Sequence, residues 1–113
     1  MIHSAFVTYA FSSSHAYGEG MCAKVHGHRF RVRVAVEDDF DRMPSSEDLL
    51  AAVRALGGEL HLRDLNVMLA PSAPNPQGIA MWFWEKLALR FPLSEVQVWQ
   101  DDEIGWTLRR PAL

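Results

Sequence analysis

A short segment of the chain, HAYGEGMCAKVHGHRF from His15 to Phe30, contains three of the five histidines and the only cysteine. His26 and His28 are two residues apart, so in a β-strand both imidazoles point to the same face. Three imidazoles that converge from adjacent strands suit a catalytic zinc ion, which takes three protein ligands and keeps a fourth position open. Such an ion polarises a carbonyl or hydroxyl group, or acidifies a bound water. The segment predicts a Zn²⁺ site formed by His15, His26 and His28.

Other interpretations of the same residues stay open at this point. Each histidine can be an ordinary hydrogen-bonded side chain, although the His-x-His pair with a third histidine upstream favours a metal. Cys22 can be a buried apolar residue, a metal ligand or a reactive thiol. Its position four residues before His26 favours the thiol, because a nearby metal or imidazolium stabilises the thiolate.

Two alternating segments are predicted to hold these side chains. In residues 3–11 apolar and polar side chains alternate, which is typical of a strand, and His15 has the parity of the apolar positions. In residues 28–37 one face carries Phe30 and three valines and the other carries Arg29, Arg31 and Arg33. His26 and His28 share the Phe30 face, so all three histidines are expected on the buried side. The arginine face is interpreted as solvated or intersubunit.

Two helices are predicted between this pair of strands and the C-terminal segment. The first is capped by Ser45 and carries an apolar stripe, and Gly57-Gly58 are expected to end it. The second begins at Asn75-Pro76, a capping residue followed by proline at the first helical position. Residues 60–73 lie between the helices and fit neither a helical nor a strand period well.

Two short strands, 96–100 and about 106–109, complete the predicted order β-β-α-α-β-β. Strands paired in hairpins with helices between them predict an α+β fold, an antiparallel sheet with both helices on one face. The length of 113 residues suits a single domain, expected over residues 1–113.

Composition excludes several classes of protein. The net charge of -3 does not suggest a nucleic-acid partner, and no apolar run is long enough for a membrane span. The N-terminal residues lack a basic region followed by a long apolar segment, so no signal peptide is expected. A single cysteine cannot form an internal disulfide, which favours a reducing compartment, with the cytoplasm as the expectation.

The motifs Phe11-Ser-Ser-Ser-His15 and Cys22-x-x-x-His26-Gly-His28 resemble those of the 6-pyruvoyl-tetrahydropterin synthase and 6-carboxy-tetrahydropterin synthase family. The resemblance implies the tunnelling fold, and zinc held by His15, His26 and His28. It also implies Cys22 as the proton-transfer catalyst, a small-molecule substrate, and a homo-oligomer, a barrel hexamer with pockets at subunit interfaces.

Three positions depart from the family pattern. The Asp-His pair that is thought to activate the cysteine reads His61-Leu62 here, and the opening of the second helix has become Pro-Asn-Pro-Gln-Gly. The glutamate that anchors the pterin ring is Gln100. A neutral amide loses the charge-assisted bidentate contact, at a cost of about 2 kcal/mol or more.

From these departures we expect a zinc-dependent lyase-type enzyme with an altered substrate. Cys22 and His61 are its predicted catalytic residues, and Gln100 is its predicted substrate-binding residue. The alternative is a non-catalytic, zinc-stabilised oligomer that binds a ligand or a partner.

Overall fold

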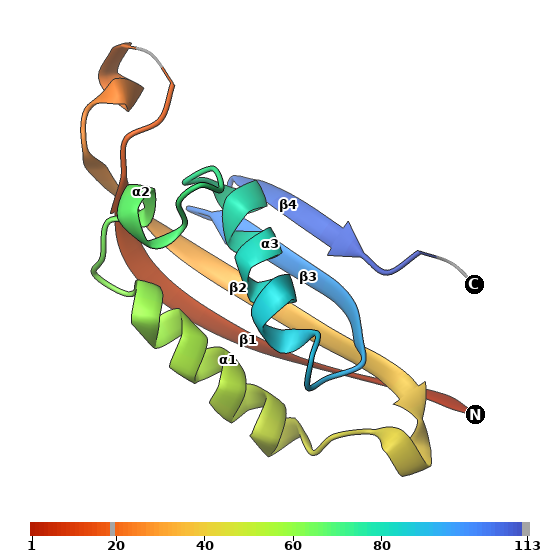
Figure 1. Ribbon diagram of the computed structural model, residues 1–113. Helices are drawn as coiled ribbons and strands as arrows, with labels where there is room; N and C mark the ends of the chain where they lie inside the picture. Colours follow the sequence, from red (N-terminus) through yellow and green to blue (C-terminus); the bar gives the residue numbers. More distant parts are fainter. Residues whose placement is uncertain (19, 112–113) are drawn as a thin grey trace.

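Four antiparallel strands form one sheet in the order β1-β2-β3-β4, and the helices cover one of its faces (Figure 1). The computed structural model describes residues 1–18 and 20–111, apart from the side chains of Met21 and Cys22. The predicted α+β class and the order of the main elements are confirmed. The elements are β1 (Ile2–His15), the 3₁₀ turn η1 (Gly20–Ala23), β2 (His26–Asp39), the 3₁₀ turn η2 (Phe40–Arg42), α1 (Ser46–Leu60), α2 (Leu65–Met68), α3 (Pro76–Leu87), β3 (Leu93–Gln100) and β4 (Ile104–Arg109).

The β1–β2 hairpin is longer than the sequence predicts at both ends. Its register runs from Ile2 opposite Asp39 to His15 opposite His26, so all three histidines of the cluster belong to regular strands. Directly opposed residues share a face of an antiparallel sheet. The histidines therefore lie on the same face as Phe11 and Phe30, which are buried.

The hydrophobic core lies between the helices and this face of the sheet. Its fully buried members come from β2, β3, the apolar stripes of α1 and α3, and Leu65 of α2, and both predicted helices pack on one side of the sheet (Figure 1). In the part of the chain that the structure describes, no helix is both long and apolar enough to span a membrane. The largest fully buried side chains are Phe30, Phe83, Leu49, Leu60, Leu65, Ile79 and Leu87.

The predicted end of α1 at Gly57-Gly58 is wrong, because the helix continues to Leu60. Gly57 is buried, and a Cβ atom there would lie 2.4 Å from the ring of Tyr9 in β1. The glycine thus permits close packing of helix on sheet rather than ending the helix. The helix ends where His61 turns to an extended conformation and its N–H donates to the carbonyl of Gly57.

Residues 61–64 lie along the outer edge of β1, which explains why this segment has no clear period. The N–H of Leu62 donates to Ser12 O, and the N–H of Ser14 donates to Arg63 O. Leu62 has a φ of 58°, in the left-handed region that few non-glycine residues adopt. These bonds are made to a strand distant in sequence, so the local pattern of apolar residues does not reveal them.

Candidate metal centre and active site

Three histidine side chains converge at the end of the β1–β2 hairpin. His15, the last residue of β1, is buried, and His26 and His28 at the start of β2 are half-buried. One ring nitrogen from each lies within 4.8 Å of those of the other two. Nε2 of His15 and Nε2 of His26 are 3.0 Å apart.

The three rings are each held by a hydrogen bond at Nδ1. The acceptors are Pro74 O at 2.5 Å for His15, Lys24 O at 2.7 Å for His26, and Asp101 Oδ2 at 2.5 Å for His28. Carbonyl and carboxylate oxygens only accept, so each Nδ1 must carry the proton. The lone pair of each imidazole is then on Nε2, which is the tautomer that binds a metal when Nδ1 is anchored.

The spacing between the ring nitrogens of His15 and His26 fits a zinc ion. Two nitrogens bound to one tetrahedral zinc at about 2.05 Å lie about 3.3 Å apart, close to the 3.0 Å between His15 and His26. Burial lowers the pKa of His15, and the neighbouring His28 and His26 lower it further. His15 is therefore neutral at pH 7, which is the form that coordinates a metal. The cluster can hold zinc through three Nε2 atoms.

The roles predicted for Cys22 and His61 stay predictions. Cys22 belongs to η1, but its side chain lies outside the described residues. His61 is exposed, and its Nδ1 accepts the N–H of Ser12 at 3.1 Å, so its proton must be on Nε2. Ser12 precedes His15 by three residues, about 10 Å along β1. The ring of His61 therefore accepts a backbone hydrogen bond at the edge of the sheet, in the place where a neighbouring strand would otherwise supply the acceptor.

Gln100 ends β3 on the helix-covered face of the sheet. It lies opposite Phe30 of β2 on one side and Ile104 of β4 on the other, and it is half-buried. Phe30 is two residues after His28, so Gln100 and the histidine cluster share one end of one face. This position is compatible with a substrate contact beside the metal centre.

Two hollows lie at the end of the sheet that carries the histidine cluster, and one of them includes His28. One of about 240 Å³ lies between the start of α3 and β4, and it is lined by Tyr17, Asn75, Pro76, Gln77, Ile104, Gly105 and Trp106. The other, of about 480 Å³, includes His28, Asp101, Leu62 and the serines at the end of β1. The first hollow is lined by Asn75, which follows Pro74 in the chain, and by Ile104, which lies opposite Gln100.

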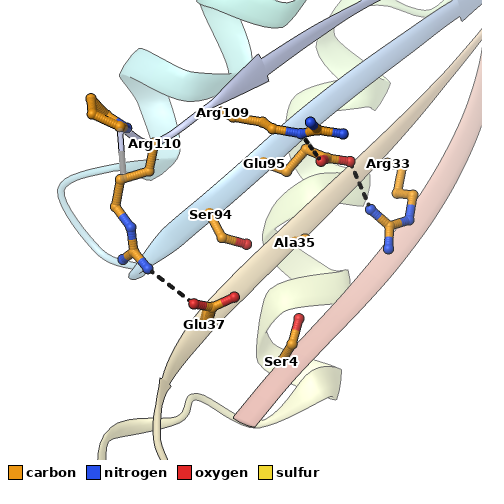
Figure 2. A pocket seen from close by; sticks show the side chains of 9 residues that line it. Ser4, Arg33, Ala35, Glu37, Ser94, Glu95, Arg109 and Arg110 are labelled. Carbon is orange, nitrogen blue, oxygen red and sulfur yellow. Dashed lines mark hydrogen bonds and ion pairs between the residues drawn. The ribbon is translucent and has the colours of Figure 1, made fainter. Parts of the chain in front are cut away.

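A third hollow, of about 470 Å³, lies on the open face of the sheet, away from the histidines (Figure 2). Glu95 is shared there by Arg33 at 3.0 Å and Arg109 at 2.8 Å, and Arg110 contacts Glu37. Arg33 is five residues beyond His28, about 17 Å along β2. The arginine row of β2 thus lies on the open face, with its charge partly matched by carboxylates.

Sequence reasoning missed the contact between Asp101 and His28. The carboxylate also accepts the N–H of Arg29, and this bond and the His28 contact lower the pKa of Asp101. The residue is therefore ionised at neutral pH. The only signal in the sequence was an acidic turn after the third strand, which does not reveal a partner 73 positions away.

The family model described as 6-pyruvoyl tetrahydropterin synthase matches residues 5–111. The chain belongs to this family. Among curated proteins, the dihydroneopterin monophosphate aldolase of Pyrococcus furiosus is 27% identical over 103 residues, covering 85% of this chain and 88% of that protein. The match to the family model confirms the family resemblance that the sequence motifs indicate.

Solved structures show the same fold in other members of this structural class. The 6-pyruvoyl tetrahydropterin synthase of Caenorhabditis elegans superposes with a TM-score of 0.82 at 16% identity, over 98% of this chain and 97% of that one. An uncharacterized protein of Wolinella succinogenes superposes with a TM-score of 0.75 at 15% identity, over 98% and 99%. The tunnelling fold expected for the family is therefore confirmed.

Proposed function

We propose that the protein is a zinc-dependent lyase-type enzyme that acts on a small oxygenated molecule, with a substrate that differs from that of the pterin synthases. The observation that carries this proposal is the convergence of three Nε2 atoms whose rings are each anchored at Nδ1. Structural zinc sites use four protein ligands, whereas three ligands leave a position for substrate. Membership of the family adds support, because the named relatives are a synthase and an aldolase.

In this proposal His15, His26 and His28 bind the metal and fix its position. When bound, the zinc supplies Lewis-acid polarisation of the substrate oxygens. His15 is the most buried of the three and is also hydrogen-bonded to the Pro74 carbonyl. The substrate oxygens would be placed at the position that the three imidazoles leave free.

The substrate ring is proposed to lie in the hollow between α3 and β4. Tyr17 and Trp106 supply aromatic surface there, and Asn75 and Gln77 supply amides. Gln100, beside this hollow, is the proposed substrate-binding residue, and its amide offers both an acceptor and donors. A pterin that needs a carboxylate partner would bind more weakly to the amide of Gln100. A related ring whose hydrogen-bonding groups match an amide is therefore favoured as the substrate.

Cys22 is the proposed proton-transfer residue, and His61 is the proposed assistant. A thiolate near a metal or an imidazolium is both basic and nucleophilic at neutral pH. A reducing compartment such as the cytoplasm, the proposed location, would preserve this thiol. His61 can take part only through Nε2 while its Nδ1 accepts from Ser12. In the position where the family has its second dyad residue, this chain has Leu62.

Replacing Cys22 with alanine is expected to reduce turnover by about 100-fold or more, because general acid–base groups contribute at least that much. The assay would use zinc-loaded protein and a panel of dihydroneopterin, its monophosphate and triphosphate, and other vicinal diols on planar rings. Zinc content, measured by atomic emission, should stay unchanged in the variant. Full activity of Cys22→Ala on a substrate of the wild type would reject the assigned role.

The second candidate function is a catalytically inactive, zinc-stabilised oligomer that binds a ligand or partner. It is favoured by Leu62 and Gln100, which replace an acid–base residue and an anchor of the family pattern. Under this alternative zinc still stabilises the fold, but no member of the panel turns over at high enzyme concentration. Cys22→Ala would then have no effect on stability or ligand binding.

A homo-oligomer, expected to be a hexamer from the family resemblance, is part of the proposal. β1 and β4 are the two outer strands of the sheet, and each leaves a backbone edge that another copy can pair with. Exposed apolar side chains, Phe6 on β1 and Ile104 and Trp106 on β4, lie on these strands. Light scattering should give a mass near six times the 12.8 kDa of one chain. A monomer mass at micromolar concentration would contradict this expectation.

A further inference from the structure

Asp101 is the first residue of the turn between β3 and β4, and it makes three polar contacts with β2. Its N–H donates to Arg29 O at 2.7 Å, and its Oδ1 accepts the N–H of Arg29 at 3.0 Å. Its Oδ2 accepts the Nδ1–H of His28 at 2.5 Å. Backbone and side-chain contacts of Asp101 thus join the turn to His28 and Arg29 of β2. Of these two residues, His28 is a candidate metal ligand.

The neighbouring Asp102 shows that this arrangement is specific to one position of the turn. Both residues have left-handed backbones, with φ values of 53° and 57°. Asp102 points elsewhere and pairs with Arg31 at 3.2 Å, and its side chain is 70% exposed against 36% for Asp101. Both oxygens of Asp101 already accept a hydrogen bond from β2, whereas the ion pair of Asp102 is with Arg31 rather than with the histidine cluster.

Among the three histidines, His28 has the strongest hydrogen-bond partner. His15 and His26 donate to backbone carbonyls, whereas His28 donates to an ionised carboxylate. Charge-assisted hydrogen bonds are about twice as strong as neutral ones. A carboxylate on the far side of a metal-binding imidazole also fixes the tautomer and raises the basicity of the ligand nitrogen.

We propose that Asp101 is a positioning residue that holds His28 in the Nδ1–H tautomer with Nε2 toward the other two histidines, and that it couples metal binding to the conformation of the β3–β4 turn. This inference rests on the proposed metal centre. Gln100 immediately precedes Asp101, so the residue proposed to contact substrate is attached to the same turn. Since coupling between two sites is reciprocal, a metal that orders His28 also orders the turn beside Gln100.

The test compares Asp101→Asn with the matched control Asp102→Asn. Asparagine keeps the size of aspartate and tolerates the left-handed backbone, so each variant removes one charge from the same turn. Zinc affinity is measured by competition with a chromophoric chelator. Asp101→Asn should bind zinc about 10- to 100-fold more weakly, as expected for loss of an outer partner of a metal ligand. Asp102→Asn should bind zinc as the wild type does.

Two further measurements separate positioning from a merely structural role. Nitrogen-15 NMR of the zinc-loaded wild type should show a proton on Nδ1 of His28. Zinc should slow amide exchange at residues 101–103 in the wild type and in Asp102→Asn, but not in Asp101→Asn. If Asp101→Asn does not fold, the tautomer of His28 and the zinc-dependent exchange in the wild type still decide the question.

Equal zinc affinity in the two variants, or an unprotonated Nδ1 on His28, would overturn the inference. Zinc binding by the wild type without turnover of any substrate would reject the proposed enzyme but leave the role of Asp101 standing. A wild type that binds no zinc would reject both. The two proposals therefore fail in distinguishable ways.

Discussion

Removal of zinc by a chelator is expected to lower the melting temperature of the protein by about 10 °C. A metal present at about 100 times its Kd stabilises the folded state by about 2.7 kcal/mol if the unfolded chain does not bind it. For a domain of this size each kcal/mol corresponds to roughly 4 °C. Three imidazoles with their Nδ1 atoms already bonded need little reorganisation to bind. Thermal unfolding followed by circular dichroism, with and without chelator, measures the shift.

The control for this experiment is a pair of histidine variants. His28→Ala removes a half-buried ligand and should abolish the zinc-dependent shift while the protein remains folded. His3→Ala removes an exposed histidine at the far end of β1, where its ring lies 5.3 Å from that of Phe40, and should retain the shift. A full shift in His28→Ala, or none in the wild type, would contradict the metal centre.

Gly78→Ala is expected to destabilise the protein by about 3 kcal/mol or more, the upper range for overpacking, with a loss of roughly 12 °C in melting temperature. A Cβ atom at residue 78 would lie 1.7 Å from the carbonyl oxygen of Ala73 and 2.7 Å from its carbon. These are backbone atoms, which cannot move aside as a side chain can. Ala73 precedes Pro74, whose carbonyl holds His15, so zinc affinity should fall as well.

The matched control is Gly58→Ala in α1, where a Cβ atom would have no neighbour within 4 Å. This variant should stabilise the protein by about 0.5 to 1 kcal/mol, since alanine is the better helix former. Urea titration of both variants measures the two free energies of unfolding. Equal stability of Gly78→Ala and the wild type would show that the α3 start can shift without cost.

The sequence predicted the histidine cluster because the side-chain period of a strand is two residues. Once the apolar face of β2 was assigned from Phe30 and the valines, the direction of His26 and His28 followed. The capping residues Ser45 and Asn75 were equally informative, and both accept the expected backbone N–H groups. Short-range periodicity and capping are local properties, so a single sequence is enough to reveal them.

The parts that the sequence did not reveal depend on contacts between distant residues. Gly57 continues a helix because Tyr9, 48 positions earlier, packs against it. Residues 61–64 take their conformation from the edge of β1, which supplies their hydrogen bonds, and Asp101 meets His28 only through the pairing of β2 with β3. Their local sequence is compatible with several conformations, and tertiary packing selects one of them.

The segment that borders β1 also limits how far another strand can grow along that edge. At Ser12 and Ser14 the outward backbone groups are already taken by residues 61–63. Hydrogen-bonding positions on one side of a strand recur every second residue, so the equivalent groups lie at Ser4, Phe6, Thr8 and Ala10. An incoming strand that pairs there must stop before Ser12. Residues 61–63 thus limit how far an added strand can extend along β1. Strand addition is confined to the N-terminal part of β1, away from the histidines.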